Sequence, residues 1–376
     1  MVLCGFCKTG SKERLKKCIC GKVSYCDAKC QANDWRTHKA SCPPYRVKVV
    51  PGRGRGLFAT RRIKPGQIIL QELPIHTWGA ELAQIPEREY VDKLGKEKKK
   101  KILNFHDPVE NIVKMKDDNV DVKERSDQRT LLKVINQTIL YQRIGLKDPD
   151  VCKFYRIFHG NGIPVCEDPS LHSKSGKEKG LYSEISLINH SCNPNALHTW
   201  VMEDFKRKEV RAMKVIEVHE EILINYADSV DFNFGSREFR RSKLLQNSAF
   251  TCSCSECSLT GESLLENERI RSEIRKKRSE IDKLNEEKAP PPRRPMKTVK
   301  KYVKINQEIV ELVKKLDIQH EIPSALMECF NVVELTDIFG IRSVPDADLY
   351  RREALEYSER FGAKHLNIYN ELMETM

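Results

Sequence analysis

The spacing of apolar and polar positions first shows strand-like stretches behind the N-terminal 44 residues. Short apolar runs, RVKVV and later QIILQEL, follow Tyr45 and are separated by glycine-rich segments. This pattern predicts β-strands, two of which are joined by a turn at Lys64-Pro65-Gly66. Residues 79–158 are mainly helical in pattern and strongly charged, which predicts helices with solvated faces.

A second strand-like region extends from Gly180 to Tyr226. Its stretch HTWVMEDFKRKEVRAMKVIEV predicts a β-hairpin in which the polar DFKRKE forms the turn. The strand signals end after Thr260, and residues 262–288 predict one charged helix. The following APPPRRP, residues 289–295, predicts a stiff linker, behind which three or four further helices are expected. The pattern as a whole predicts an α+β protein.

Cysteine is the residue whose distribution changes this picture most. Seven of the fourteen cysteines lie within the first 42 residues. In a reducing compartment, clustered thiols favour metal binding over a disulfide framework. With one histidine they form four ligand pairs, which suffices for two tetrahedral Zn²⁺ sites whose binding energy would fold the small module. Residues 28–38 are expected to form a short helix that carries two of the ligands. The eight candidate ligands are Cys4, Cys7, Cys18, Cys20, Cys26, Cys30, His38 and Cys42.

A third candidate zinc site lies far along the chain. Cys252, Cys254 and Cys257 supply three thiolates, and a tetrahedral site requires a fourth ligand. Cys192, within NHSCNPN, is the candidate for that ligand. The competing interpretation is that Cys192 is a small buried core residue, which is common for a single cysteine.

The charge of the chain is strongly basic and unevenly distributed. The net charge is +12, and residues 1–50 carry eleven Lys and Arg against three Asp and Glu. Such a module could contact nucleic acid or acidic protein segments, or the charge could simply be a solvated basic surface. The run from Lys96 to Lys101 is interpreted as a solvated helix face or loop, with a localisation signal as the alternative.

Hydropathy bears on the compartment. No apolar run is long enough for a membrane span, and the N-terminal MVLCGFCKTG has none long enough for a signal peptide. We therefore expect an intracellular protein, in the nucleus, the cytoplasm or both.

Two sets of motifs resemble known modules. The run YC-x3-CQ-x3-W-x2-H-x3-C, Tyr25 to Cys42, resembles the MYND zinc finger. The segments GRGRGLFA, SLINHSCNPNA and EILINY, followed by CSCSEC, resemble the SET domain and its post-SET cysteine cluster. Together they resemble the SET-and-MYND (SMYD-type) protein lysine methyltransferases. The finger stands ahead of the glycine-rich start here, whereas it interrupts the SET domain in better-known members, so the chain resembles a divergent branch.

The resemblance implies an architecture. It consists of a two-zinc MYND finger, a SET-type pseudoknotted β core with a helical insertion, a post-SET zinc site and a C-terminal helical tail. The expected domains are 1–44 for the finger, 45–228 for the SET domain with its insertion at about 79–158, 229–260 for the post-SET segment, and 261–376 for the helical domain. The resemblance also implies interleaved zinc ligands. Cys4, Cys7, Cys26 and Cys30 would hold one ion, and Cys18, Cys20, His38 and Cys42 the other.

The resemblance further implies S-adenosyl-L-methionine as methyl donor and Zn²⁺ at three sites. The pseudoknot would place Asn189, His190 and Tyr226 together, with Tyr226 as the catalytic residue that orients the lysine amine. A lysine has a pKa of about 10.4, and a narrow aromatic channel favours its neutral, nucleophilic form. Phe250 resembles an aromatic wall of this channel, although ordinary core packing is an equal alternative. The implied cofactor-binding residues are Arg53, Gly54, Arg55, Gly56, Asn161, Asn189, His190, Tyr226 and Phe250.

The predicted function is therefore protein-lysine N-methylation of a histone or non-histone protein by a monomer. The finger would dock proline-rich or acidic protein segments, with direct binding of nucleic acid through residues 1–50 as a weaker possibility and no membrane partner. The alternative is a catalytically inactive SET/MYND scaffold that acts as a transcriptional corepressor. The intact Asn189, His190 and Tyr226 count against this alternative, since an inactive copy need not keep them.

Overall fold

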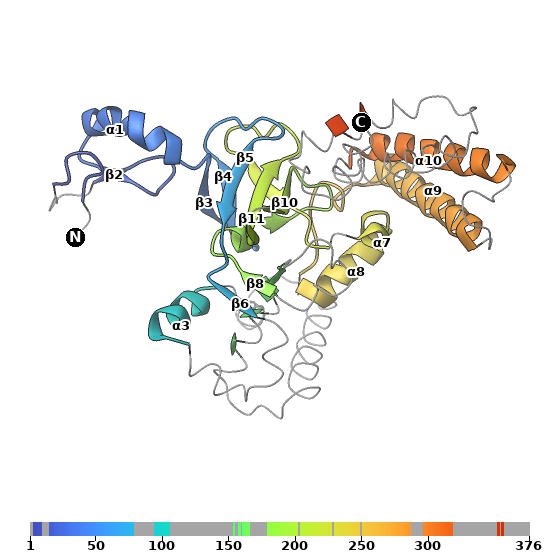
Figure 1. Ribbon diagram of the computed structural model, residues 1–376, viewed down its shortest axis with the longest axis horizontal. Helices are drawn as coiled ribbons and strands as arrows, with labels where there is room; N and C mark the ends of the chain where they lie inside the picture. The colour runs from blue at the N-terminus through green and yellow to red at the C-terminus, as the bar shows by residue number, and fades with distance from the viewer. Residues whose placement is uncertain are drawn as a thin grey trace.

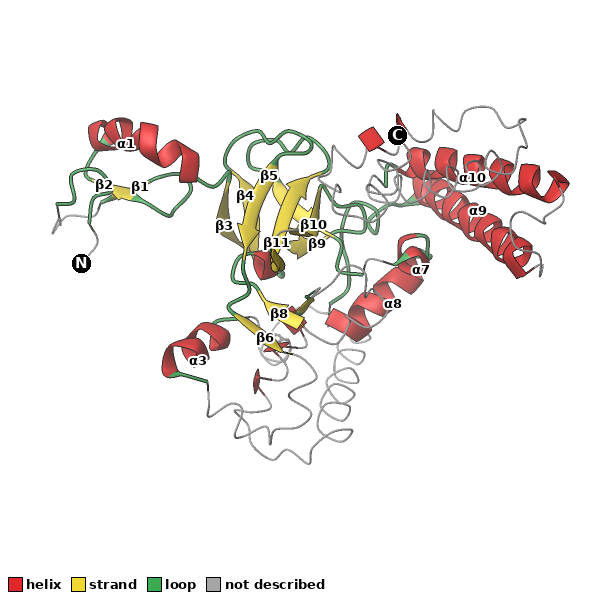
Figure 2. Cartoon of the chain, viewed as in Figure 1, coloured by secondary structure: helices red, strands yellow, loops and turns green. Residues whose placement is uncertain are grey.

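The computed structural model describes residues 3–9, 15–78, 94–105, 153–154, 157–158, 160–165, 179–201, 204–227, 229–248, 250–286, 296–318, 352–353 and 355–356. The finger lies at one end of the molecule and two long helices lie at the other, with the strands between them (Figure 1). Figure 2 shows the same division by secondary structure, with most strands gathered in the centre.

The N-terminal finger is one helix packed beside a short hairpin. Strand β1 (Lys16–Lys17) pairs antiparallel with β2 (Ser24–Tyr25), and helix α1 spans Ala28–Ser41. The helix begins where it does because the Asp27 side chain accepts the Cys30 backbone N–H at 2.7 Å, which satisfies a donor of the first turn. The predicted helix at 28–38 is confirmed and is one turn longer.

The finger has almost no ordinary apolar core. Its buried residues are Tyr25, His38 and four cysteines, with Val23 and Cys30 packed against this group. Such a module cannot offset the entropy of ordering its chain by apolar burial alone, which supports the prediction of structural metal.

The first central sheet has the strand order β3-β4-β12-β9. Strands β3 (Tyr45–Val50) and β4 (Gly54–Ala59) form a hairpin, and β12 (Glu221–Ile224) pairs antiparallel with β4. Strand β9 (Asn189–His190) pairs parallel with β12. A short 3₁₀ turn, η4 (Ile185–Leu187), leads into β9. The chain therefore brings residues near 50, 190 and 220 into one sheet.

The second sheet corrects one prediction. Its order is β10 (Ala196–Val201), β11 (Asp204–Ala212) and β5 (Ile68–Glu72), all antiparallel. The segment DFKRKE, residues 204–209, lies inside β11, so the prediction that it forms the hairpin turn was wrong. The buried charge of Glu209 is tolerated in this central strand because it is paired. Glu209, only 2% exposed, accepts from Gln71 at 2.5 Å and also bonds its neighbour Arg211.

A third small sheet joins β6 (His76–Trp78), β8 (Lys179–Leu181) and β7 (Ile163–Pro164). The predicted turn at Lys64-Pro65-Gly66 lies between β4 and β5, where Gly66 has a φ of 78°. These two strands belong to different sheets, so the turn carries the chain from one sheet to the next.

One apolar cluster holds the central sheets together. Its members come from both larger sheets and from the turn before β9. The fully enclosed residues are Leu57, Ala59, Ile63, Tyr182, Ile185, Ile188, Ala196, Val210, Ala212, Ile216 and Ile222.

Only part of the predicted helical insertion is described. Helix α3 (Lys96–Leu103) contains the lysine run, which confirms the solvated helix: Glu97 and Lys101 form an exposed i,i+4 ion pair at 2.9 Å. Ile102 is its buried residue. Most of residues 79–158 lies outside the described residues.

Four helices are described in the C-terminal part: α7 (Val230–Asn233), α8 (Arg237–Ser248), α9 (Gly261–Glu286) and α10 (Met296–Leu316). Helix α9 confirms the charged helix predicted at 262–288. It packs along α10 through an apolar seam (Figure 1). The linker at 289–295 and nearly all of the chain beyond residue 318 lie outside the described residues. Within the described part, none of the helices combines the length and apolar character needed to cross a bilayer.

Candidate functional site

The first cysteine cluster joins the N-terminal segment of the finger to the start of helix α1. Cys4, Cys7, Cys26 and Cys30 place their sulfur atoms within 4.8 Å of one another, with Cys7 and Cys26 at 3.6 Å. Burial raises the pKa of Cys4, but backbone N–H groups of Cys26, Cys7 and Phe6 outweigh it and lower this pKa to about 6. Backbone donors therefore favour the thiolate, which is the form that binds metal.

The second cluster is fully buried and includes the histidine of helix α1. Cys18, Cys20, His38 and Cys42 again have all donor atoms within 4.8 Å. The Cys20 sulfur lies 3.5 Å from Nε2 of His38, and the Cys18 and Cys42 sulfurs are 4.0 Å apart. Trp35 stacks edge-on against the His38 ring at 6.1 Å between centroids, which fixes the ring orientation.

These two groups have the interleaved pairing that the resemblance implied. Sulfur atoms of a tetrahedral zinc site with Zn–S bonds of about 2.3 Å lie about 3.8 Å apart, close to the separations seen here. Four soft or borderline ligands converging on one point suit Zn²⁺ and leave no open coordination position. The donor sets therefore fit two structural zinc ions.

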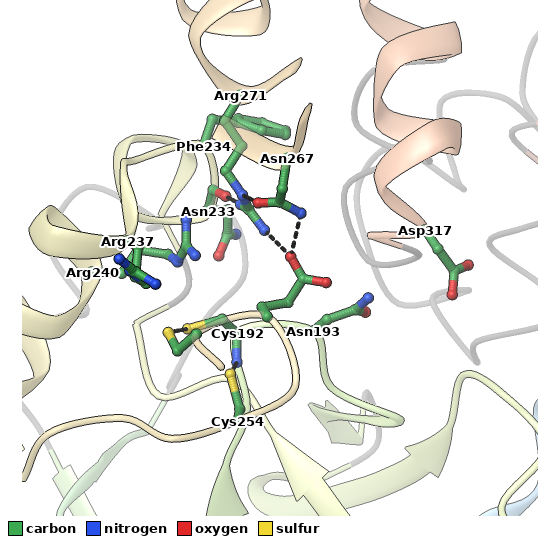
Figure 3. Close-up of polar contacts among 12 residues, drawn as sticks. Cys192, Asn193, Asn233, Phe234, Arg237, Arg240, Cys254, Asn267, Arg271 and Asp317 are labelled. Atoms are coloured by element: carbon green, nitrogen blue, oxygen red, sulfur yellow. Dashed lines mark hydrogen bonds and ion pairs between the residues drawn. The ribbon is translucent and has the colours of Figure 1, made fainter. Parts of the chain in front are cut away.

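The third cluster confirms the predicted place of Cys192. Its sulfur is 3.6 Å from that of Cys257, and its backbone N–H donates to the sulfur of Cys254 at 3.4 Å. With Cys252 it completes a group of four thiols within 4.8 Å, in which only Cys254 is not fully buried. Cys192 therefore lies beside the post-SET cysteines (Figure 3), although the first of them, Cys252, follows it by 60 residues in the sequence. It is not an isolated cysteine of the core.

The parallel pairing of β9 with β12 creates the centre of the site. Leu223 lies opposite Asn189 and Ile224 opposite His190. Since β12 also pairs with β4, residues 53–56, 189–190 and 221–226 converge. This is the juxtaposition that the pseudoknot of the resemblance implied.

His190 and Tyr226 contact each other directly. The Tyr226 backbone N–H donates to Nδ1 of His190 at 3.1 Å, and the two rings lie 5.4 Å apart. Nε2 of His190 lies 3.4 Å from the Cys192 sulfur. Burial lowers the pKa of His190 to about 4, so its ring is neutral, with Nδ1 as acceptor and the proton on Nε2 facing the sulfur. His190 thus connects the cysteine cluster to Tyr226.

The Tyr226 hydroxyl donates to the carbonyl of Ile188 at 2.7 Å. Tyr226 exposes 43% of its surface, yet the protein packed around it raises its pKa by desolvation, and the carboxylate of Glu221 adds to this effect. The side chain is therefore a neutral phenol with an exposed face.

A chain of polar contacts crosses the same sheet. Arg53 forms an ion pair with Glu221 at 2.7 Å, and Glu221 accepts from the Asn189 amide at 2.8 Å. The same amide also reaches the carbonyl of Arg55 at 3.2 Å, and the Arg55 side chain donates to the Asn104 carbonyl at 3.0 Å. The three segments are thereby held in register by charge-assisted bonds.

Gly56 is required by this crowding. A Cβ atom at Gly56 would stand 2.6 Å from Oε1 of Glu221 and 3.0 Å from Nδ2 of Asn189. Gly54 instead has a φ of 77°, a conformation that side chains disfavour.

Two further predicted cofactor-binding residues, Phe250 and Asn161, lie in different parts of the structure. Phe250 is half-buried and packs at 6.0 Å from His190 and 6.2 Å from Tyr226, so it belongs to the aromatic group around the centre. Asn161 lies next to β7 and its amide donates to the carbonyl of Ile157 at 2.8 Å, in the part of the chain that forms the small third sheet.

Several residues of the centre were missed by sequence reasoning. Glu221 bridges Arg53 and Asn189, and its position at the start of EILINY was the one signal that pointed to it. Arg240 and Arg271, both 0% exposed, lie beside the post-SET cysteines. They occur in charged helices whose pattern indicates solvent exposure, so no local pattern indicated their burial.

Both modules match known families. The MYND finger model matches residues 4–42 and the SET domain model matches residues 54–227. The N-lysine methyltransferase SMYD2 of Homo sapiens is 29% identical over 260 residues, which cover 68% of this chain and 50% of that protein. SMYD2 of Bos taurus is 26% identical over 328 residues, covering 86% and 62%, and the histone-lysine N-methyltransferase SMYD3 of Homo sapiens is 25% identical over 300 residues, covering 75% and 58%.

Among solved structures, the SET domain of LSMT bound to lysine and AdoHcy matches with a TM-score of 0.33 and 12% identity, covering 92% of this chain and 91% of that one. Rubisco LSMT bound to AdoMet matches with a TM-score of 0.32 and 13% identity, covering 91% and 90%.

A zinc finger of the MYND type therefore precedes a SET domain in one chain, as the sequence predicted. The chain is similar to the SET-and-MYND proteins SMYD2 and SMYD3, which are named lysine methyltransferases. It spans 50–62% of the length of the relatives that it matches.

Proposed function

We propose that the protein is a protein-lysine N-methyltransferase that uses S-adenosyl-L-methionine as methyl donor. The observation that carries this proposal is the parallel pairing of β9 with β12, which brings Asn189, His190 and Tyr226 into one centre beside Arg53. The relatives named lysine methyltransferases support it through the matched finger and SET domain.

The chemistry follows from the state of each group. When bound, S-adenosylmethionine would supply an electrophilic methyl group, whose C–S bond breaks as the lone pair of an unprotonated lysine amine forms the new N–C bond. The hydroxyl proton of Tyr226 is committed to the carbonyl of Ile188. Its oxygen is left as an acceptor for an amine N–H, so Tyr226 orients the lone pair. Because its pKa is raised, Tyr226 stays a neutral phenol and does not act as a phenolate base.

The remaining residues hold the geometry. His190 fixes the backbone of Tyr226, and the aromatic side chain of Phe250 helps to exclude water from the amine. Asn189 with the Arg53–Glu221 pair offers polar groups for the amino-acid and adenine parts of the donor, and Gly54, Gly56, Arg55 and Asn161 are further candidates. The three cysteine clusters would hold structural zinc ions.

The finger is proposed as a docking module for proline-rich or acidic protein segments. Its exposed apolar residues include Leu3, Phe6, Ile19 and Trp35, and residues 1–50 carry eleven Lys and Arg against three Asp and Glu. We propose the division of the chain at residues 44, 228 and 260, and residence in the nucleus, the cytoplasm or both.

The test is incubation of the purified zinc-loaded protein with methyl-labelled S-adenosylmethionine and a panel of histones and cell-extract proteins. Label recovered as methyl-lysine after hydrolysis of a panel protein is expected. Binding of the cofactor by calorimetry without label on any protein would contradict the proposal and favour the inactive scaffold. A basic surface that binds DNA with a steep salt dependence would instead assign the finger to nucleic acid.

A further inference from the structure

Three arginines of helices α8 and α9 surround the post-SET cysteine cluster. Arg240 and Arg271 are completely buried, and Arg241 is half-buried. Figure 3 shows Arg240 and Arg271 on the side of the cluster that faces the helices. A buried guanidinium is costly unless its charge and its donors are satisfied, so each of these side chains requires a partner.

Two of the three arginines have complete partners. Arg241 donates from Nε to the Cys252 carbonyl at 3.0 Å and from Nη2 to the Cys257 carbonyl at 3.1 Å. Arg271 forms an ion pair with Glu256 at 2.7 Å, and its Nε donates to Asn267 at 2.8 Å. Arg271 and Glu256 neutralise each other.

Arg240 differs from its neighbours. Its Nη1 donates to the Gly235 carbonyl at 2.5 Å, but among the described residues Nε and Nη2 are buried without a hydrogen-bond partner of good geometry. The side chains of the cluster that interact with this guanidinium are those of Cys192 and Cys257. Two unsatisfied donors and a full positive charge therefore face the cysteine cluster.

The charge of a metal-loaded cluster explains this arrangement. Four thiolates on Zn²⁺ carry a net charge of −2, and three of the four cysteines are fully buried. A buried anion needs nearby positive charge and donors, and Arg240 is the fully buried cation beside the cluster whose charge Glu256 does not already neutralise. Hydrogen bonds from the surroundings to ligand atoms orient the ligands and tune the metal.

We propose that Arg240 is the counter-charge and hydrogen-bond donor to the zinc-bound sulfurs of Cys192 and Cys257. It thereby acts as a positioning residue for the centre, because Cys192 contacts His190 and His190 holds the backbone of Tyr226. This inference rests on zinc at the post-SET site, which is part of the proposed function. It does not require methyl transfer to be observed.

The experiment measures cysteine protection site by site. The full-length zinc-loaded protein is exposed to a chelator and N-ethylmaleimide, and each cysteine is followed by mass spectrometry over time. In Arg240→Gln we expect Cys192, Cys252, Cys254 and Cys257 to be alkylated about 10-fold or more faster than in the wild type. The seven cysteine ligands of the finger serve as internal controls and should keep their rates. Arg269→Gln, an exposed arginine of α9 paired with Glu266 and Glu273, is the matched control and should change nothing.

Wild-type alkylation rates in Arg240→Gln would overturn the proposal. Equal acceleration at all three clusters would also overturn it, since Arg240 would then support only the fold in general. If Arg240→Gln does not fold, Arg240→Lys decides. It keeps the charge and loses the planar fork, so acceleration confined to the post-SET cysteines supports the proposal, and unchanged rates overturn the hydrogen-bond role assigned to the guanidinium. Failure of methyl transfer in the wild type, with this alkylation pattern intact, would reject only the proposed function.

Discussion

At the scale of single residues, the polar side chains of the centre are packed so closely that no space remains for an additional side-chain atom at Gly56. Asn189 reaches a carbonyl of one strand and a carboxylate of another, and Glu221 in turn holds Arg53. Gly56 lies between them, where an added Cβ would touch both side chains. A change of one carbon at this position must therefore move a residue of the centre.

Gly56→Ala tests this crowding. The new methyl group would meet Glu221 and Asn189 at distances that force both to shift, so we expect a loss of about 1–3 kcal/mol in stability together with weaker binding of S-adenosylmethionine. Gly95→Ala is the control, because a Cβ atom there would meet no described atom within 4 Å and its φ is −59°. Thermal unfolding and calorimetric titration measure the two effects. Cofactor affinity equal to that of the wild type would show that the Asn189–Glu221 contact does not matter for the donor.

The sequence predicted some residues of the centre and missed others. Asn189, His190, Tyr226 and Cys192 were predicted, because their motifs resemble a family in which strands thread through one another. Glu221 and Arg240 were not, since each works through a partner distant in sequence, and a charged residue in a polar stretch is ordinarily solvated. Burial of Arg240 depends on where α8 packs, which no local pattern records.

At the scale of elements, the charge pattern misled for one strand and was correct for one helix. Strand β11 looked like a turn because DFKRKE is polar, but the sheet supplies partners for Glu209. Helix α9 is equally charged, and its identification was confirmed because apolar residues recur along one face. The spacing of apolar residues predicts an element well when only one of its faces is buried. It fails for an element such as β11, in which charged residues are buried together with their partners.

The seam between α9 and α10 gives a direct prediction. Ile274 is 0% exposed and packs in the apolar cluster with Ile309 and Val313 of α10. Ile274→Ala should lower the free energy of unfolding of this part by about 2–5 kcal/mol through lost burial and a cavity. Leu265→Ala on the same helix, at a position 70% exposed, should stay within about 0.5 kcal/mol of the wild type. Denaturant unfolding followed by helical circular dichroism makes the comparison, and equal midpoints for the two variants would contradict the packed seam.

At the scale of the whole molecule, three parts are stabilised by different means. The finger depends on metal ligands, the central sheets on an apolar cluster, and the α9–α10 pair on its seam. Individual polar contacts join these parts. Lys22 of the finger pairs with Glu184 of the core, and Lys214 donates to Asn193, next to Cys192, at 2.9 Å and to the carbonyl of Asp317 after α10 at 3.0 Å.

Removal of metal should affect these three parts differently. A strong chelator is expected to unfold the finger and to loosen the post-SET cluster, while the sheets keep their structure because their apolar cluster contains no metal ligand among the described residues. Hydrogen exchange read by mass spectrometry checks this. Peptides of 15–42 should lose protection, and those of 54–59 and 204–212 should retain it; re-addition of Zn²⁺ should restore the finger. Unchanged protection of 15–42 after complete zinc loss would contradict a metal-folded module.

The central claim is that Tyr226 orients a lysine amine for methyl transfer, and Tyr226→Phe tests it most directly. The variant keeps the ring packing against His190 and Phe250 and loses only the hydroxyl. The rate of label transfer from S-adenosylmethionine to a protein substrate is measured for both forms, alongside cofactor affinity. We predict a rate lower by about 10²-fold or more with nearly unchanged cofactor affinity. A variant that transfers label at the wild-type rate, or one that loses transfer and cofactor binding together, would contradict a catalytic role for the Tyr226 hydroxyl.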